Sequence, residues 1–164
     1  MTIVADGKPC VCGNRGCWEQ YAAAASAVPQ YLNGHQSTQN QTVFRFLDVV
    51  RKAEEGEKKA IEVLQNLGKY LGIGIANIFS GIGIPRVIIS GRLVYGWKFI
   101  NQSLVDSVEQ SLASKIKGWT VERGEPSGAG LGGAFEIAFN EYIIRDHYLK
   151  ERYLEPVNGF EPPT

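Results

Sequence analysis

The sequence predicts an α/β fold that is rich in helices and contains a short mixed sheet. Apolar residues recur at helical spacing through residues 42–56, 57–80 and 97–116, and a fourth helical pattern lies near the end of the chain. Short runs rich in β-branched residues stand between these patterns. A chain of 164 residues with 44% hydrophobic content suits one domain with a substantial core. Three short strands are few for so many helices, so we expect part of a larger α/β fold.

Capping and turn signals divide the first half of the chain. The expected elements, in chain order, are a strand at 2–5, a cysteine-rich loop, a helix at 17–32, a polar surface loop at 33–41, and helices at 42–56 and 57–80. Pro29 should interrupt its helix because proline lacks a backbone N–H. Thr42 is placed to cap the next helix. Gly72 and Gly74 weaken the longest helix, which indicates close backbone packing there.

The second half of the chain alternates strands with helices. The expected elements are a strand at 85–90, a turn at Gly91, a helix at 97–116, a strand at 119–125, a glycine loop at 126–133 and a terminal helix at 134–154, followed by a loose tail. The run at 85–90 is continuously apolar, which is typical of a strand covered on both faces in a parallel or mixed sheet. The sequence contains no internal repeat.

The charge balance and the hydropathy pattern exclude some classes of function. Seventeen basic and seventeen acidic side chains cancel, so this chain offers no electrostatic case for direct nucleic-acid binding. No apolar run approaches the roughly 20 residues that span a bilayer, and the polar first residues do not form a signal peptide. We therefore expect a cytoplasmic protein without membrane contacts.

All three cysteines of the chain lie within eight residues, at Cys10, Cys12 and Cys17. A secreted disulfide framework would spread an even number of cysteines along the chain. A disulfide between Cys10 and Cys12 would be strained because one residue separates them. Gly13 and Gly16 allow the loop to double back, so three thiolates can meet on one zinc ion. The alternative is three free thiols that pack as small hydrophobic groups.

A structural zinc site needs a fourth ligand, which the cysteine loop does not supply. His35 and His147 are the only histidines, and we expect both on the surface.

A second motif resembles a cofactor-binding fingerprint, since Gly128, Gly130 and Gly133 fit G-x-G-x-x-G between a strand and a helix. No further strand follows it, so a dinucleotide-binding βαβ unit cannot be built there. Close packing between helix and strand explains these glycines better.

The segment DGKPCVCGNRGCWEQY resembles the signature of the ROK family (repressors, open reading frames and sugar kinases), which reads C-x-C-G-x-x-G-C-x-E. Two later segments, GKYLGIGIANIFSGIGIPRVIISGRL and GAGLGGAFEIAF, are also similar to this family. In the family, a Gly-His pair before the first cysteine supplies the fourth zinc ligand. Met1 stands where that pair would have ended. The resemblance therefore implies a zinc site that is incomplete in this chain.

The resemblance implies the C-terminal portion of an actin-like, ribonuclease H-like ATPase fold. It places a C-terminal ROK lobe at 1–143, without the N-terminal lobe, and the end of the terminal helix with a loose tail at 144–164. It also implies that Glu19 accepts hydrogen bonds from the hydroxyls of a sugar. The residues alone would make Glu19 a first-turn glutamate favoured by the helix dipole. Gly91, Gly130 and Gly132 would line a nucleotide cleft in members that bind ATP.

Two functions are compatible with the resemblance. The chain can be the sugar-binding and oligomerisation portion of a transcription regulator, which would meet DNA only through an absent N-terminal helix-turn-helix domain. It can instead be the C-terminal lobe of an ATP-dependent, glucokinase-like sugar kinase. Ser90 and Arg92 depart from the consecutive glycines of the kinases and favour the regulator. A third alternative is a stand-alone zinc module.

Catalysis by this chain alone is not expected. In the ROK kinases, the aspartate base and the phosphate loop precede the cysteine signature, so their counterparts would lie before Met1. The resemblance also implies a homo-oligomer.

Overall fold

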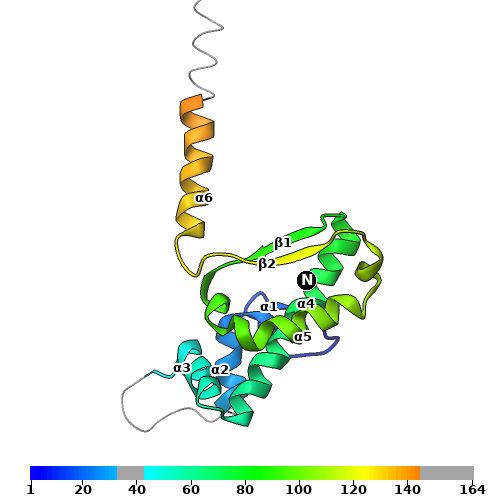
Figure 1. Cartoon of the computed structure of the whole chain (residues 1–164), viewed down its shortest axis with the longest axis vertical. Helices are drawn as coiled ribbons and strands as arrows, with labels where there is room; N and C mark the ends of the chain where they lie inside the picture. The colour runs from blue at the N-terminus through cyan, green and yellow to red at the C-terminus, as the bar shows by residue number, and fades with distance from the viewer. Residues whose placement is uncertain (33–42, 145–164) are drawn as a thin grey trace, which may run out of the picture. The chain divides into compact units, whose positions relative to one another are not determined.

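The computed structural model describes residues 1–32 and 43–144 (Figure 1). The chain divides into two units, residues 1–127 and residues 128–164, which are treated separately. The elements of the first unit are α1 (Glu19–Ala22), α2 (Ala24–Leu32), α3 (Phe46–Glu54), α4 (Lys58–Ile82), β1 (Arg86–Ile89), the 3-10 helix η1 (Gly91–Gly96), α5 (Trp97–Glu109), the 3-10 helix η2 (Leu112–Lys115) and β2 (Thr120–Arg123). The second unit contains α6 (Ala129–Ala138) and a π-helical segment, η3 (Phe139–Ile144).

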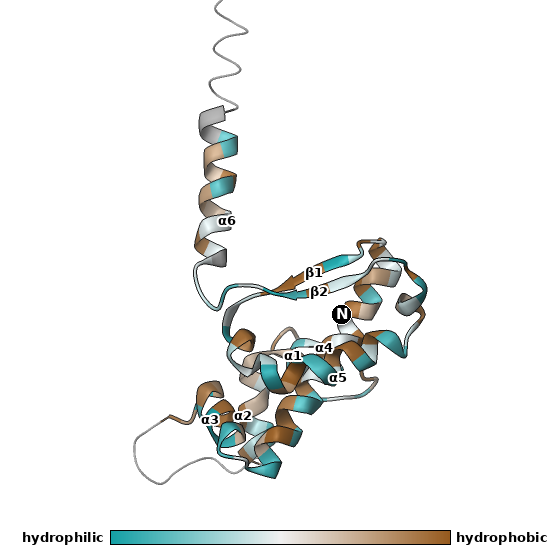
Figure 2. Ribbon diagram, in the orientation of Figure 1, coloured by the Kyte–Doolittle hydropathy of each residue, from teal (hydrophilic) through white to brown (hydrophobic). Residues whose placement is uncertain are grey.

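Helix α4 is the centre of the first unit, and α1, α2, α3 and α5 all pack against it (Figure 1). Figure 2 shows hydrophobic and hydrophilic residues alternating along α3, α4 and α5, as expected for helices with one buried face. The largest fully buried side chains are Phe79, Leu64, Leu67, Ile75, Ile100, Leu104, Val49 and Val108. They form one core between these helices, and α4 confirms the prediction of a long helix at 57–80.

Two glycines set the distance between α4 and α5. A methyl group added at Gly68 would collide with the carbonyl oxygen of Ile100, and one added at Gly72 would collide with the carbonyl of Leu104. These glycines lie one turn apart on the face of α4 that meets α5. The backbones of the two helices therefore approach more closely than any residue with a Cβ would allow.

The sheet of the first unit consists of two parallel strands. Arg86 of β1 pairs with Thr120 of β2, and the register continues to the pair Ile89–Arg123. Helix α5 lies in the connection between them, as a parallel pair requires. Only Ile89 of β1 is buried, and Ile88 is 56% exposed. The prediction that both faces of this strand are covered is therefore wrong for the part of the chain that the structure describes.

The third predicted strand, at residues 2–5, does not join this sheet. Thr2 instead forms an isolated antiparallel bridge with Cys17. The carbonyl of Gly16 accepts hydrogen bonds from the N–H groups of both Ile3 (2.9 Å) and Val4 (3.3 Å), which bends the segment onto the cysteine loop. The first residues of the chain thus pair locally rather than with β1 or β2.

Several predicted helix boundaries move. The break in the first helix falls at Ala23, whose backbone is extended, while Pro29 lies inside α2. Ser26 stabilises this new helix start, because its N–H and its hydroxyl both donate to the carbonyl of Ala23. Helix α3 begins at Phe46, where the Asp48 carboxylate accepts the N–H of Arg45. Thr42, the predicted cap, lies outside the described residues.

The predicted glycine loop at 126–133 is wrong in its second half. Helix α6 begins at Ala129, directly after Gly128, which adopts a positive φ of 88°. The N–H of Gly132 donates to the carbonyl of Gly128 at 2.8 Å, so the glycines that follow are already helical. The predicted division of the chain at 143/144 stays a prediction, because almost all of residues 144–164 lie outside the described part.

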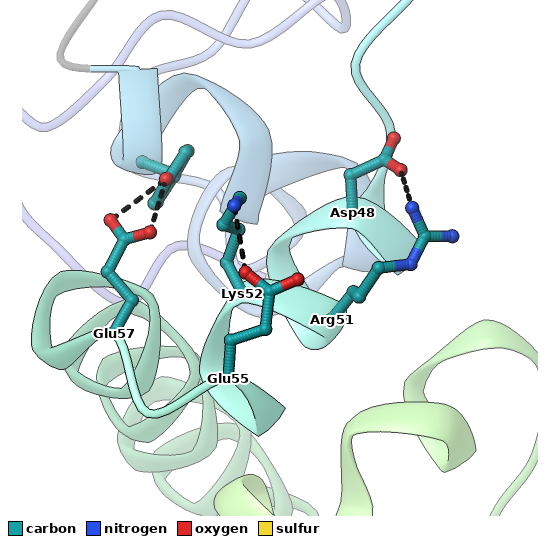
Figure 3. Close-up of polar contacts among 6 residues, drawn as sticks. Asp48, Arg51, Lys52, Glu55 and Glu57 are labelled. Carbon is teal, nitrogen blue, oxygen red and sulfur yellow. Dashed lines mark hydrogen bonds and ion pairs between the residues drawn. The ribbon is translucent and has the colours of Figure 1, made fainter.

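Polar side chains make several contacts where α2, α3 and α4 meet (Figure 3). The Tyr31 hydroxyl contacts both carboxylate oxygens of Glu57, at 2.9 and 3.0 Å, and these contacts join α2 to the start of α4. Lys52 pairs with Glu55 at 2.8 Å within the neighbouring segment. Both members of this ion pair are exposed, and such surface pairs contribute little to stability. The mixed charges here fit a solvated helix junction.

The close contact at Gly68 predicts that Gly68→Ala destabilises the protein. The added methyl group forces α4 away from α5, and overpacking of this kind costs about 1–3 kcal/mol. Gly81→Ala is the matched control, because Gly81 is an exposed position of the same helix and nothing lies within 4 Å of its added methyl group. This control should stabilise the protein by up to about 1 kcal/mol through helix propensity. Urea denaturation measures the free energy of unfolding of both variants. A shift of both denaturation midpoints in the same direction would contradict the packing argument.

Candidate metal centre

The structure brings the three cysteines together. Their Sγ atoms all lie within 4.8 Å of one another, and the Cys12 and Cys17 sulfurs are 3.5 Å apart. In a tetrahedral zinc site with Zn–S bonds of about 2.3 Å, two sulfurs are separated by about 3.8 Å. The observed spacing therefore fits three ligands of one ion. His35 and His147 lie outside the described residues.

The cysteine loop is folded back by its own backbone. The N–H of Cys10 donates to the carbonyl of Asn14 at 2.8 Å, and the N–H of Gly13 donates to the carbonyl of Cys10 at 3.0 Å. Gly13 and Gly16 have φ angles of 86° and 68°, a region that favours glycine. A Cβ at Gly16 would also collide with the carbonyl of Val4. The two glycines thus make the turn geometrically possible, as the sequence predicted.

Two aromatic residues anchor this loop to the core. The Tyr21 hydroxyl accepts the backbone N–H of Lys8 at 2.8 Å, and the Tyr21 ring lies 4.8 Å from the ring of Tyr70 on α4. The Trp18 indole donates to the carbonyl of Tyr70 at 2.8 Å and lies where a side chain on Gly74 would otherwise be. Sequence reasoning missed the roles of Tyr21 and Trp18. The available signal for Trp18 was Gly74, a glycine within the buried helix α4 that leaves room for a large neighbouring side chain.

The thiols of Cys10 and Cys17 have different electrostatic surroundings. Hydrogen bonding with the Cys12 side chain, together with burial, raises the pKa of the Cys17 thiol to about 11. The backbone and side chain of Cys12 lower the pKa of the Cys10 thiol, and a smaller contribution comes from Gln20. The Gln20 amide reaches the Cys10 sulfur at 3.6 Å. Donors of this kind favour the thiolate that a metal requires.

Glu19 directly follows this centre in the sequence. It is the first residue of α1, two positions after Cys17, and it is exposed. A carboxylate at this position is available to a ligand in solution, and it also suits the positive end of a helix. The contact of Glu19 with a sugar stays a prediction.

The predicted nucleotide-contacting glycines fall in different units. Gly91 turns the chain from β1 into η1 with a φ of 78°, and its N–H already donates to the carbonyl of Glu125 at 2.9 Å. Gly130 and Gly132 lie within α6, in the second unit. Binding of a nucleotide by these three residues stays a prediction.

Comparison with known proteins identifies relatives of both predicted classes. The xylose repressor of Bacillus subtilis (strain 168) is 30% identical over 149 residues, which cover 91% of this chain and 36% of the repressor. The N-acetyl-D-glucosamine kinase of Vibrio cholerae is 27% identical over 128 residues, which cover 77% of this chain and 40% of the kinase. The chain thus spans well under half the length of both curated relatives.

The fold also has a solved counterpart. The crystal structure of a ROK family transcriptional regulator, a homologue of the E. coli MLC protein, matches with a TM-score of 0.64 and 26% identity. The match covers 75% of this chain and 33% of the regulator, which is consistent with a partial fold. The sequence model that describes the ROK family matches residues 1–141 of this chain, which include the whole cysteine loop and the glycines of α6. This chain therefore belongs to the ROK family.

Proposed function

We propose that this chain is the sugar-binding, zinc-stabilised portion of a ROK transcription regulator. The observation that carries the proposal is the convergence of three sulfurs directly before the helical turn that begins with Glu19. In this proposal the chain contributes the C-terminal part of an actin-like fold and the contacts of a homo-oligomer. DNA would be bound by a separate N-terminal domain of the longer protein.

In the proposed site, the cysteine sulfurs bind the metal and the Glu19 carboxylate binds the sugar. Cys10, Cys12 and Cys17 would hold the ion, which when bound cross-links the loop and adds its binding free energy to folding. Glu19 would accept hydrogen bonds from sugar hydroxyls, a task that suits an acceptor-only, charged group. Trp18, between Cys17 and Glu19, ties this segment to α4. Sugar binding at Glu19 would then shift the lobes of the regulator and change its affinity for DNA.

A sugar kinase is the second candidate, since one relative is an N-acetyl-D-glucosamine kinase. The turn at Gly91 favours the regulator. Gly91 already uses its N–H in a bond to Glu125, and Arg92 places an exposed side chain at the same turn. The Ser90 hydroxyl lies so close to Gly124 that a side chain there would collide with it. The Gly91 backbone and the Ser90 side chain thus lie against Gly124 and Glu125, which directly follow β2.

The coding sequence upstream of Met1 distinguishes the two candidates. A regulator should encode a helix-turn-helix, and the longer protein should then bind DNA in a sugar-dependent manner in a mobility-shift assay. A kinase should instead encode a phosphate loop and an aspartate base, and should consume ATP in a coupled assay when the sugar is added. An upstream sequence with a phosphate loop and sugar-dependent ATP consumption would overturn the regulator proposal.

A fourth zinc ligand from a histidine before Met1 gives a second prediction. Thr2 pairs with Cys17 and the Met1 carbonyl accepts the N–H of Trp18 at 2.9 Å, so a residue placed before Met1 starts close to the cysteine loop. Extending the chain with Gly-His should raise zinc affinity by at least about tenfold, the lower end of the effect of groups that support a metal site.

Competition with a chromophoric chelator measures this affinity in reduced protein. An extension with Gly-Ala is the matched control and should leave the affinity unchanged. Equal affinities for the two extended chains would show that the histidine is not the missing ligand.

The role of Glu19 gives a third prediction, which applies to the longer protein that contains this chain. Glu19→Gln keeps the shape of the side chain but removes its charge, so sugar affinity should fall by roughly tenfold or more, since bonds to charged groups contribute about 1.5–3 kcal/mol. Glu54→Gln, at the exposed end of α3, is the control and should bind sugar normally. Isothermal titration calorimetry measures both. Unchanged affinity of the Glu19 variant would leave this residue with only a helix-terminal role.

A further inference from the structure

Two adjacent thiols of the cysteine loop, those of Cys12 and Cys17, differ sharply in accessibility. Cys12 is exposed, whereas Cys17 is only 8% exposed, and their sulfurs are 3.5 Å apart. We propose that Cys12 and Cys17 are a peroxide-sensitive dithiol whose disulfide removes two of the three sulfur donors and so abolishes metal binding. This inference goes beyond the proposed sugar response, and formation of the disulfide does not depend on it.

The loop geometry selects this pair over the alternative at its tip. Cys10 and Cys12 are separated by one residue, and a disulfide between such neighbours is strained. Four residues separate Cys12 from Cys17, and two of them are the positive-φ glycines that reverse the chain. A disulfide bond is about 2.05 Å long, so the two sulfurs need to approach by about 1.5 Å. A methyl group added at Gly13 would have no neighbouring atom within 4 Å, so the exposed end of the loop has room to move.

The reaction with a hydroperoxide balances without a further reactant. The Cys12 sulfur attacks one oxygen of hydrogen peroxide, the O–O bond breaks, and Cys12 becomes a sulfenic acid as the first water leaves. The Cys17 sulfur then attacks the Cys12 sulfur, the S–O bond breaks, and the second water leaves. Two thiols are oxidised to one disulfide while one peroxide is reduced to two waters. A thiol reductant reverses the change.

The disulfide would disable the metal centre because it leaves a single thiolate. Cys10 is then the only free sulfur of the cluster, and one thiolate does not make a structural zinc site. The exposed Cys12 would act as the peroxide-reactive residue, and the buried Cys17 as the residue that resolves the sulfenic acid. The same short loop would in this way bind a metal ion when reduced and lose it when oxidised.

Peptide mapping tests the pairing directly. Arg15 lies between the two cysteines, so trypsin separates residues 1–15 from residues 16–45, and the disulfide joins these two peptides. The full chain, stripped of metal with EDTA, is treated with hydrogen peroxide, blocked with iodoacetamide and analysed by mass spectrometry. We expect the joined peptides in the wild type and in Cys10→Ser, and their loss in Cys12→Ser. Circular dichroism checks that the exposed Cys12 substitution leaves the fold intact.

Zinc binding supplies the second measurement. The oxidised wild type should lose zinc binding in the chelator assay and regain it after treatment with dithiothreitol. Loss of the joined peptides in Cys10→Ser, or a wild type that yields only sulfinic acid at Cys12, would overturn the proposed pair. Full zinc binding by protein that carries the disulfide would overturn the switch. A reduced chain without zinc affinity would refute the proposed metal role, while the peptide map would still decide the disulfide.

Discussion

The close approach of other groups to the backbone of α4 is the constraint on which the first unit depends. Gly68 and Gly72 admit the backbone of α5, and Gly74 admits the Trp18 indole. Without these contacts, the core would open on one side and the cysteine loop would lose its main anchor on the other. Three small residues therefore link the stability of the helical core to the position of the candidate metal centre. Glycine weakens a helix in isolation, and here that cost is offset by packing that no other residue permits.

The cysteine loop shows how little secondary structure a site of this kind needs. Its shape comes from a few backbone hydrogen bonds, two positive-φ glycines and the hydroxyl of Tyr21. The first residues of the chain bend onto the same loop instead of entering the sheet. A bound ion would add a constraint to an arrangement that the backbone already favours.

The helices in the described part of the chain include none with the length and apolar character needed to span a membrane.

Patterns of residue type predicted the long helices, strands in the regions of β1 and β2, and the clustering of the three cysteines. These features follow from local periodicity or from spacing along a short segment, so a single sequence contains them. The mixed, three-stranded sheet was wrong for the described residues, since β1 and β2 form a two-stranded parallel sheet. The break at Ala23, the start of α6 at Ala129 and the exposure of Ile88 were not predicted. Each depends on hydrogen bonds or neighbours that sequence pattern does not specify. The role of Trp18 was missed for the same reason, since its partner lies 52 residues away.

The brevity of α1 has a thermodynamic consequence. A helix of four residues has no stability of its own, so it persists only because its flanking residues are held. Its first residue is Glu19, and the segment before it is the one that the ion would fix. In the proposed roles, the metal and the sugar therefore favour the same ordered turn. By reciprocity of linked equilibria, each would raise the affinity for the other by the same factor.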